Sequence, residues 1–150
     1  IGVASAYFAS RHPDVVVHAW EPVPHNLELA RRNLAVFGDR ITLHEKAVAP
    51  ESGSATFSVE PVGRYSGLTE FYEHENLPTE QITVDCDGIG DLLAGVLAEH
   101  DRIDLLKIDT EGSEPALLGA IPGDLLGRIG RVSYELAGEV RSVTGSDLRR

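Results

Sequence analysis

IDLLKIDTEGSE, residues 103–114, is an apolar run that ends abruptly in carboxylates and a glycine. Its first half, residues 103–108, has the Leu and Ile content of a strand covered on both faces, as parallel strands of α/β domains are. Ser113 is placed to cap a helix that begins at Glu114-Pro115. Acids between a strand's carboxyl end and the next helix lie in the crevice where open α/β sheets bind ligands. The stretch therefore predicts an α/β fold with a ligand site after this strand.

A second strand-to-helix junction lies near the start of the chain. Residues 15–20 (VVVHAW) are a strand-like run, Glu21-Pro22 closes it, and Pro24 opens a helix with apolar residues at helical spacing. A carboxylate at such a strand end can accept hydrogen bonds from both hydroxyls of a ribose. Glu21 is therefore a candidate ribose ligand, although an acid there also favours a helix N-terminus through the macrodipole.

The rest of the chain alternates between helical and strand patterns. We expect helices at 4–10, 24–37, 89–100 and 114–126, and strands at 15–20, 41–47, 54–59, 82–85, 103–108 and 131–136. Such alternation predicts a mostly parallel sheet with helices on both faces. The irregular segment 62–79 carries Tyr65 and His74, which are alternative bases or ordinary loop residues. No repeat or linker divides the chain, so a single domain is expected.

Composition limits the classes of partner. The chain has 150 residues and 42% hydrophobic content, which suits one globular domain without a bilayer-spanning stretch. Its net charge of −11 and lack of a Lys/Arg cluster argue against nucleic acid, whose phosphates need neutralisation. A single cysteine, Cys86, predicts a reducing cytoplasm and no disulfide framework. Because no base is visibly paired with Cys86, we interpret it as a small apolar strand residue.

The two junctions together resemble the FkbM-type methyltransferases, S-adenosylmethionine-dependent enzymes that mostly methylate hydroxyl oxygens. The resemblance spans residues 1 to about 136, and its most specific parts are E-P-x-P-x-N at 21–26 and K-I-D-x-E-G-x-E at 107–114. EKAV at 45–48 adds to it. It implies a Rossmann-like class I methyltransferase fold, S-adenosylmethionine as cofactor, and a small molecule or sugar as acceptor.

The same resemblance predicts a truncated domain. In the family, a strand and a loop of the type D-x-G-A-N-I-G hold the methionine end of the cofactor, and Ile1-Gly2-Val3 resembles the last residues of that loop. The chain begins without a methionine and contains none. Only residues 137–150 follow the last expected strand, where domains of this fold continue with two more. We therefore expect residues 1–150 alone to be inactive.

The resemblance also implies the cofactor-binding residues. Gly2 would let the backbone approach the cofactor, and Glu21 would bind the ribose. Lys46 and Ala47 would meet the adenine ring, with the amide of Ala47 donating to a ring nitrogen. The ordinary alternatives are a helix-start glycine for Gly2 and a plain strand end for Lys46 and Ala47.

Methyl transfer to an alcohol needs the acceptor oxygen held in line with the methyl group, and a base or metal to take the hydroxyl proton. Asp109 is the first candidate, with pairing to Lys107 as its alternative. Glu111 and Glu135 are the other candidates, whereas Glu114 is expected to be structural because dipole and capping favour acids at a helix start.

Asp109 and Glu135 together could hold a hard divalent cation, but the sequence shows no third ligand, so no metal is predicted. The family often has a histidine two residues after that glutamate. This chain has Ala137 there, so an acid/base role of that histidine does not transfer. Two alternatives stay open: a nicotinamide-dependent oxidoreductase, which would require G-x-G-x-x-G before Ile1, and a degenerate domain that binds partners without catalysis.

Overall fold

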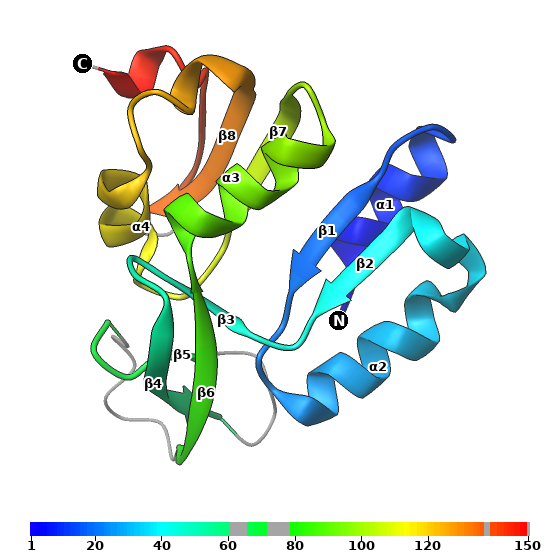
Figure 1. The fold of residues 1–150 in the computed structure, drawn as a ribbon. Helices are drawn as coiled ribbons and strands as arrows, with labels where there is room; N and C mark the ends of the chain where they lie inside the picture. The colour runs from blue at the N-terminus through cyan, green and yellow to red at the C-terminus, as the bar shows by residue number, and fades with distance from the viewer. Residues whose placement is uncertain (61–65, 72–78, 137–138, 150) are drawn as a thin grey trace. The chain divides into compact units, whose positions relative to one another are not determined.

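The computed structural model describes residues 1–60, 66–71, 79–136 and 139–149 (Figure 1). These residues form helices and strands in an α/β arrangement. The chain divides into two compact units, 1–47 and 48–150, and each is described by itself. That the two belong to one domain stays a prediction. Tyr65, His74 and Ala137, which the sequence analysis singled out, lie outside the described residues.

The first unit contains a parallel strand pair with two helices. Strand β1 (Val17–Trp20) pairs with β2 (Ile41–His44), so that Trp20 lies opposite His44. Helix α1 (Val3–Arg11) precedes β1, while α2 (Pro24–Leu34) and the 3-10 helix η1 (Ala35–Arg40) connect the two strands. The buried side chains of α2 recur at helical spacing, as predicted: Leu27, Ala30 and Leu34.

The second unit contains a four-stranded sheet with the order β3-β6-β4-β5, whose first strand starts at Ala47, the last residue of the first unit. Its strands are β3 (Ala47–Ala49), β4 (Gly53–Val59), β5 (Ser66–Leu68) and β6 (Glu80–Gly88). Strand β4 pairs antiparallel with both β5 and β6. The short partner strand predicted at 82–85 is the middle of β6, which is nine residues long because it pairs along the whole of β4.

A three-stranded sheet forms the other half of the second unit. Strand β7 (Ile103–Ile108) pairs parallel with β8 (Ile129–Leu136), and β9 (Glu139–Val143) pairs antiparallel with β8. Helices α3 (Ile89–Glu99) and α4 (Glu114–Ala120), with the short η2 (Leu126–Arg128) and η3 (Asp147–Arg149), complete the unit. The core is aliphatic: Leu93, Leu97, Ile108, Leu117 and Val132 are each less than 5% exposed.

Three sequence predictions need correction. The described sheets are mixed rather than mostly parallel, because β4, β5, β6 and β9 all form antiparallel pairs. The strand predicted at 41–47 ends at His44, and Ala47 begins β3 in a different sheet. The helix predicted at 114–126 ends at Ala120, because Ile121 precedes Pro122 and takes the extended conformation that a following proline favours.

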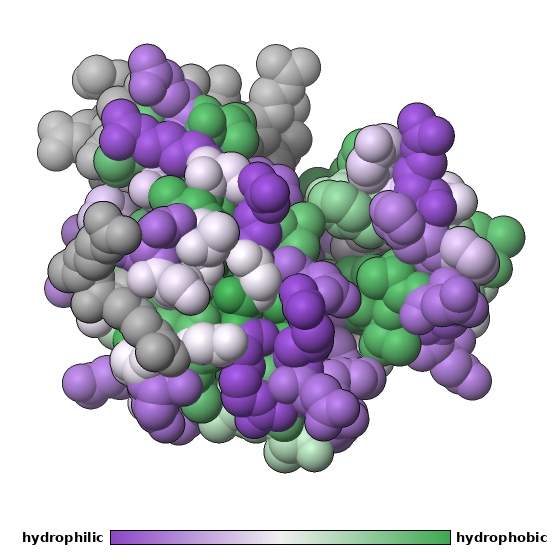
Figure 2. All heavy atoms as spheres, turned by 90° about the horizontal axis from the view of Figure 1, so that it is seen from above, coloured by the Kyte–Doolittle hydropathy of each residue, from purple (hydrophilic) through white to green (hydrophobic). Residues whose placement is uncertain are grey.

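The surface mixes polar and apolar side chains. On the face drawn in Figure 2, hydrophilic side chains are interspersed with apolar areas. The most exposed large apolar residues lie on separate elements of the chain: Val3, Val36 and Val140. Among the described residues, no helix is long and apolar enough to cross a membrane.

Candidate functional site

Two candidate residues, Asp109 and Glu135, lie at the carboxyl edge of the β7–β8 pair. Since β7 and β8 are parallel, their carboxyl ends lie at the same edge, with Asp109 just after β7 and Glu135 near the end of β8. Asp109 and Glu135 line one cavity of about 50 Å³, together with Lys107, Ile108, Ser133, Tyr134 and Val140. A space of this size holds ordered water rather than a cofactor, so it marks where the two side chains converge.

Asp109 pairs with Lys107, whose Nζ donates to Oδ2 of the carboxylate. The side chains are 41% exposed for Lys107 and 50% exposed for Asp109. A pair this exposed contributes at most about 1 kcal/mol, so exchanging Lys107 for an acceptor hydroxyl costs little. The pairing that the sequence allowed for Asp109 is therefore present, and it leaves the carboxylate within reach of a ligand.

The loop from Thr110 to Ser113 is organised by Glu114. Glu114 is 4% exposed, and its carboxylate accepts hydrogen bonds from the Thr110 amide at 2.6 Å, the Thr110 hydroxyl at 3.1 Å and the Gly112 amide at 2.9 Å. The prediction that Glu114 is structural agrees with these contacts. The predicted cap by Ser113 is wrong, because its Oγ donates to Thr110 Oγ1 at 2.7 Å and makes no side-chain cap hydrogen bond to the helix.

Glu111 has an unusual backbone conformation. Its φ is 56°, in the left-handed region that residues other than Gly, Asn and Asp rarely adopt, and Gly112 follows at φ 116°. Such a conformation costs about 1 kcal/mol or more and persists only where the surroundings hold it. The half-buried Glu111 side chain is thus presented from a constrained position two residues after Asp109.

Glu21 lies where β1 ends, at the start of α2. Its backbone N–H donates to the His44 carbonyl at 3.0 Å, which extends the β1–β2 pairing by one bond. The carboxylate Oε1 accepts from the Val23 amide at 2.9 Å, and the Asn26 side chain also hydrogen-bonds to the carboxylate. Burial raises the pKa of Glu21 above its ordinary value, while the hydrogen bonds from Val23 and Asn26 oppose that rise.

The orientation of Glu21 follows from the sequence motif E-P-x-P-x-N. Pro22 and Pro24 set the turn into the helix, with Pro24 in the first turn, where a missing N–H costs nothing. Asn26 is 7% exposed, so its amide is held in place beside the carboxylate. From the sequence alone Asn26 had no assigned role, although its place in the motif was the available signal.

An aromatic stack supports the same end of β1. The Trp20 and His44 rings stack with centroids 4.2 Å apart and planes 12° apart, across the β1–β2 register. His18 Nδ1 lies 3.3 Å from His44 Nε2. These contacts fasten β1 to β2 directly before Glu21.

The other cofactor candidates also belong to the first unit. Gly2 has φ 76° at the start of α1, and a Cβ there would lie 3.1 Å from Leu34 Cδ1, so a side chain would be both strained and crowded. Lys46 is exposed between β2 and β3, and Ala47 is 2% exposed at the start of β3. The sequence predicted that Lys46 and Ala47 end the strand that carries His44. This prediction is wrong, because that strand ends at His44 itself.

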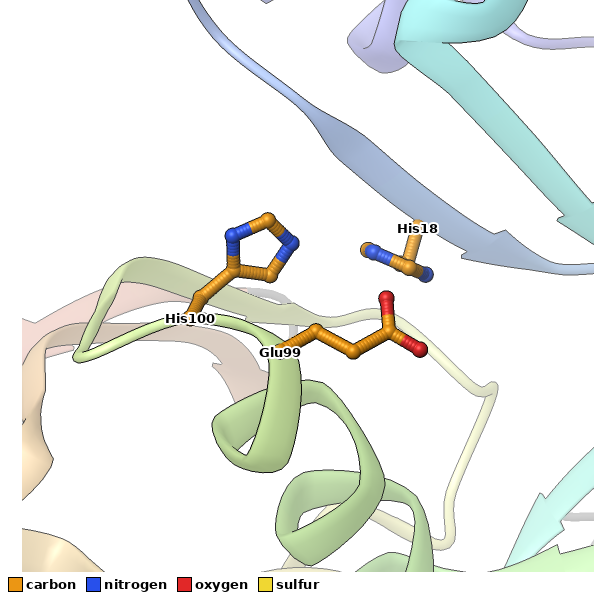
Figure 3. Close-up of side chains that lie close together, drawn as sticks. All are labelled: His18, Glu99 and His100. Carbon is orange, nitrogen blue, oxygen red and sulfur yellow. The ribbon is translucent and has the colours of Figure 1, made fainter.

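Figure 3 shows three further possible metal ligands: His18, from β1, with Glu99 and His100, from the end of α3. His18 belongs to the first unit, and Glu99 and His100 belong to the second. Because each unit is described by itself, these three side chains do not define a site. In the described part of the second unit, Asp109 and Glu135 do not belong to any group of three possible metal ligands.

Cys86 has the properties of a structural thiol. It is 4% exposed in β6, and burial, with smaller contributions from the Asp85 and Asp87 charges, raises its pKa. A raised pKa lowers the fraction of thiolate, which is the nucleophilic form.

Comparison with known proteins places the chain in a family. Residues 3–141 match the model of the methyltransferase FkbM domain, and the chain belongs to this family. It is also 24% identical over 154 residues to Methyltransferase 1 of Beauveria bassiana (strain ARSEF 2860), covering 91% of this chain and 61% of that protein. The chain thus spans less than two thirds of that relative. No solved structure matches it significantly.

Proposed function

We propose that the protein transfers a methyl group from S-adenosylmethionine to a hydroxyl group of a small molecule or sugar. The observation that carries the proposal is the convergence of Asp109 and Glu135 at the carboxyl edge of the parallel β7–β8 pair. This edge is where α/β folds bind ligands, and the FkbM family is one of methyltransferases. Family membership also disfavours the nicotinamide-dependent alternative.

Glu21 is proposed to bind the ribose hydroxyls of the cofactor. Its carboxylate is half-buried and already oriented by Val23 and Asn26, so little conformational freedom remains to be lost on binding. Gly2, whose backbone carries no side chain, and Lys46 with the Ala47 amide are proposed as further cofactor contacts. The strand-then-helix order after β1 and after β7 supports a Rossmann-like fold for these contacts.

Asp109 is proposed to take the hydroxyl proton. S-adenosylmethionine would supply an electrophilic methyl group on a sulfonium centre. With that group bound, the acceptor oxygen would form a bond to the methyl carbon as the carbon–sulfur bond broke, which would leave the methyl ether and S-adenosylhomocysteine. The carboxylate of Asp109 would take the hydroxyl proton. Glu111 and Glu135 are proposed to orient the hydroxyl beside Asp109.

A cytoplasmic location is part of the proposal. The supporting observation is that Cys86 is a single, buried, free cysteine, because proteins of a reducing compartment usually keep their thiols unpaired. The low Lys/Arg content, 13 against 24 acidic residues, supports an acceptor other than nucleic acid.

The experiment uses the full-length protein. Calorimetry with S-adenosylhomocysteine should show binding, and incubation with S-adenosylmethionine and a panel of hydroxylated small molecules and monosaccharides should yield a methylated product by mass spectrometry. Tighter binding of a nicotinamide dinucleotide would favour the oxidoreductase instead. A folded protein that binds neither cofactor would favour the degenerate domain.

A further inference from the structure

We propose that Glu114 is a positioning residue that sets the backbone of the Asp109–Gly112 loop and thereby the placement of Asp109 and Glu111. This inference rests on the proposed function for its catalytic consequence. Its structural part rests only on contacts within the second unit.

One carboxylate holds both peptide groups that flank Glu111. The Oε1 atom of Glu114 accepts from the Thr110 amide at 2.6 Å, and Oε2 accepts from the Gly112 amide at 2.9 Å. With both oxygens engaged and the side chain 4% exposed, the carboxylate clamps the chain on either side of Glu111. Charge-assisted hydrogen bonds of this kind are stronger than neutral ones, most of all away from water.

The clamp explains the left-handed conformation of Glu111. A φ of 56° is unfavourable for glutamate, and Gly112 at φ 116° adopts a conformation open mainly to glycine. Fixing the amides of Thr110 and Gly112 leaves the residue between them little choice of backbone angles. The Thr110 hydroxyl is also held by hydrogen bonds. Its Oγ1 atom accepts from Ser113 Oγ at 2.7 Å and donates to Glu114 Oε1 at 3.1 Å.

A helix cap would not account for these contacts. Helix α4 begins at Glu114, so a capping side chain would bind amides within its first turn. Thr110 and Gly112, the amide partners of Glu114, both precede the helix. The carboxylate therefore acts backward on the loop that joins β7 to α4, and that loop begins with Asp109.

The test compares three variants of the full-length protein. Glu114→Gln keeps the size of the side chain but leaves only one oxygen for two amide donors. Asp104→Asn is the matched control, because Asp104 lies on the same strand, β7, with its side chain 80% exposed. Glu111→Gly removes the candidate carboxylate while favouring the left-handed backbone.

The hydrogen-exchange rates of the Thr110 and Gly112 amides report directly on whether Glu114 holds them. In Glu114→Gln, exchange at Thr110 and Gly112 should be roughly tenfold to a hundredfold faster, and in Asp104→Asn it should be unchanged. Glu111→Gly should keep slow exchange at both amides, since its loop carries no strain to release. Unchanged exchange in Glu114→Gln would overturn the clamp.

Turnover separates positioning from mere stability. Measured well below each variant's unfolding transition, Glu114→Gln should lower kcat by about tenfold or more while S-adenosylhomocysteine affinity stays within about twofold. Normal kcat together with fast exchange would mean that Glu114 is only structural. If the wild-type protein binds no S-adenosylhomocysteine, the proposed function and its catalytic consequence fail together, while the exchange rates still decide whether Glu114 holds the loop.

Discussion

Replacing Glu21 with glutamine tests the proposed role of Glu21 in cofactor binding while keeping the contact that Glu21 makes within the first unit. Glutamine keeps one oxygen that can accept from the Val23 amide, which lies 2.9 Å from the carboxylate, so the turn into α2 should be retained. What the variant loses is the negative charge. A ribose diol would then face a neutral amide instead of a carboxylate.

The expected loss of affinity follows from the type of hydrogen bond. Bonds to a charged acceptor contribute about 1.5–3 kcal/mol and neutral ones about 0.5–1.5 kcal/mol, so the change should cost about 1–2 kcal/mol. That corresponds to roughly fivefold to thirtyfold weaker binding of S-adenosylhomocysteine. The half-buried position of Glu21 favours the upper part of this range, because burial limits screening by water.

The Glu21→Gln replacement should also change how the stability of the protein depends on pH. Burial raises the pKa of Glu21 above its ordinary value of 4.5, so the folded state holds the proton more tightly than the unfolded state. The contribution of Glu21 to the free energy of unfolding is therefore present at low pH and is lost as the pH rises above 4.5. Glu21→Gln lacks this loss, so its stability relative to wild type should improve as the pH is raised above 4.5 in a series of urea denaturations.

The control is Glu28→Gln, because Glu28 lies on α2 with its side chain 59% exposed and pairs with Arg32. It should leave cofactor affinity unchanged, because the Glu28 side chain is largely exposed on α2. Calorimetry with S-adenosylhomocysteine on all three proteins decides the matter. A folded Glu21→Gln protein with wild-type affinity would remove Glu21 from the site.

Further outcomes are expected elsewhere. Asp109→Asn should lower kcat by roughly a hundredfold or more with cofactor affinity nearly intact, as single-turnover and binding measurements would show; equal turnover refutes the role, and activity lost to a chelator and restored by Mg²⁺ would favour a metal shared with Glu135. Arg128 donates to the carbonyls that end α3, at 2.8 to 3.0 Å, so Arg128→Ala should lower the free energy of unfolding by about 1–2 kcal/mol in urea, against little change for the exposed Arg102→Ala.

The sequence alone determined the local elements and the family. The apolar run at 103–108 is β7 at the predicted residues, and Pro24 opens α2 as expected. Both rest on short-range physics: strand residues show their burial in composition, and proline restricts the backbone of its own helix start. The motifs at 21–26 and 107–114 likewise identified the FkbM family, which residues 3–141 match.

Only the tertiary structure decided which residues lie together. Asp109 and Glu135 lie at one edge because β7 pairs with β8 as its parallel neighbour. Ala47 lies in a different strand from His44 because β3 pairs with β6. Strand pairing joins segments that are far apart in the chain, and the hydrophobic periodicity of one segment does not identify its partner. The backward reach of Glu114 onto Thr110 and Gly112 was hidden for a related reason: spacing shows that an acid starts a helix, whereas burial and the left-handed turn at Glu111 decide which amides its carboxylate meets.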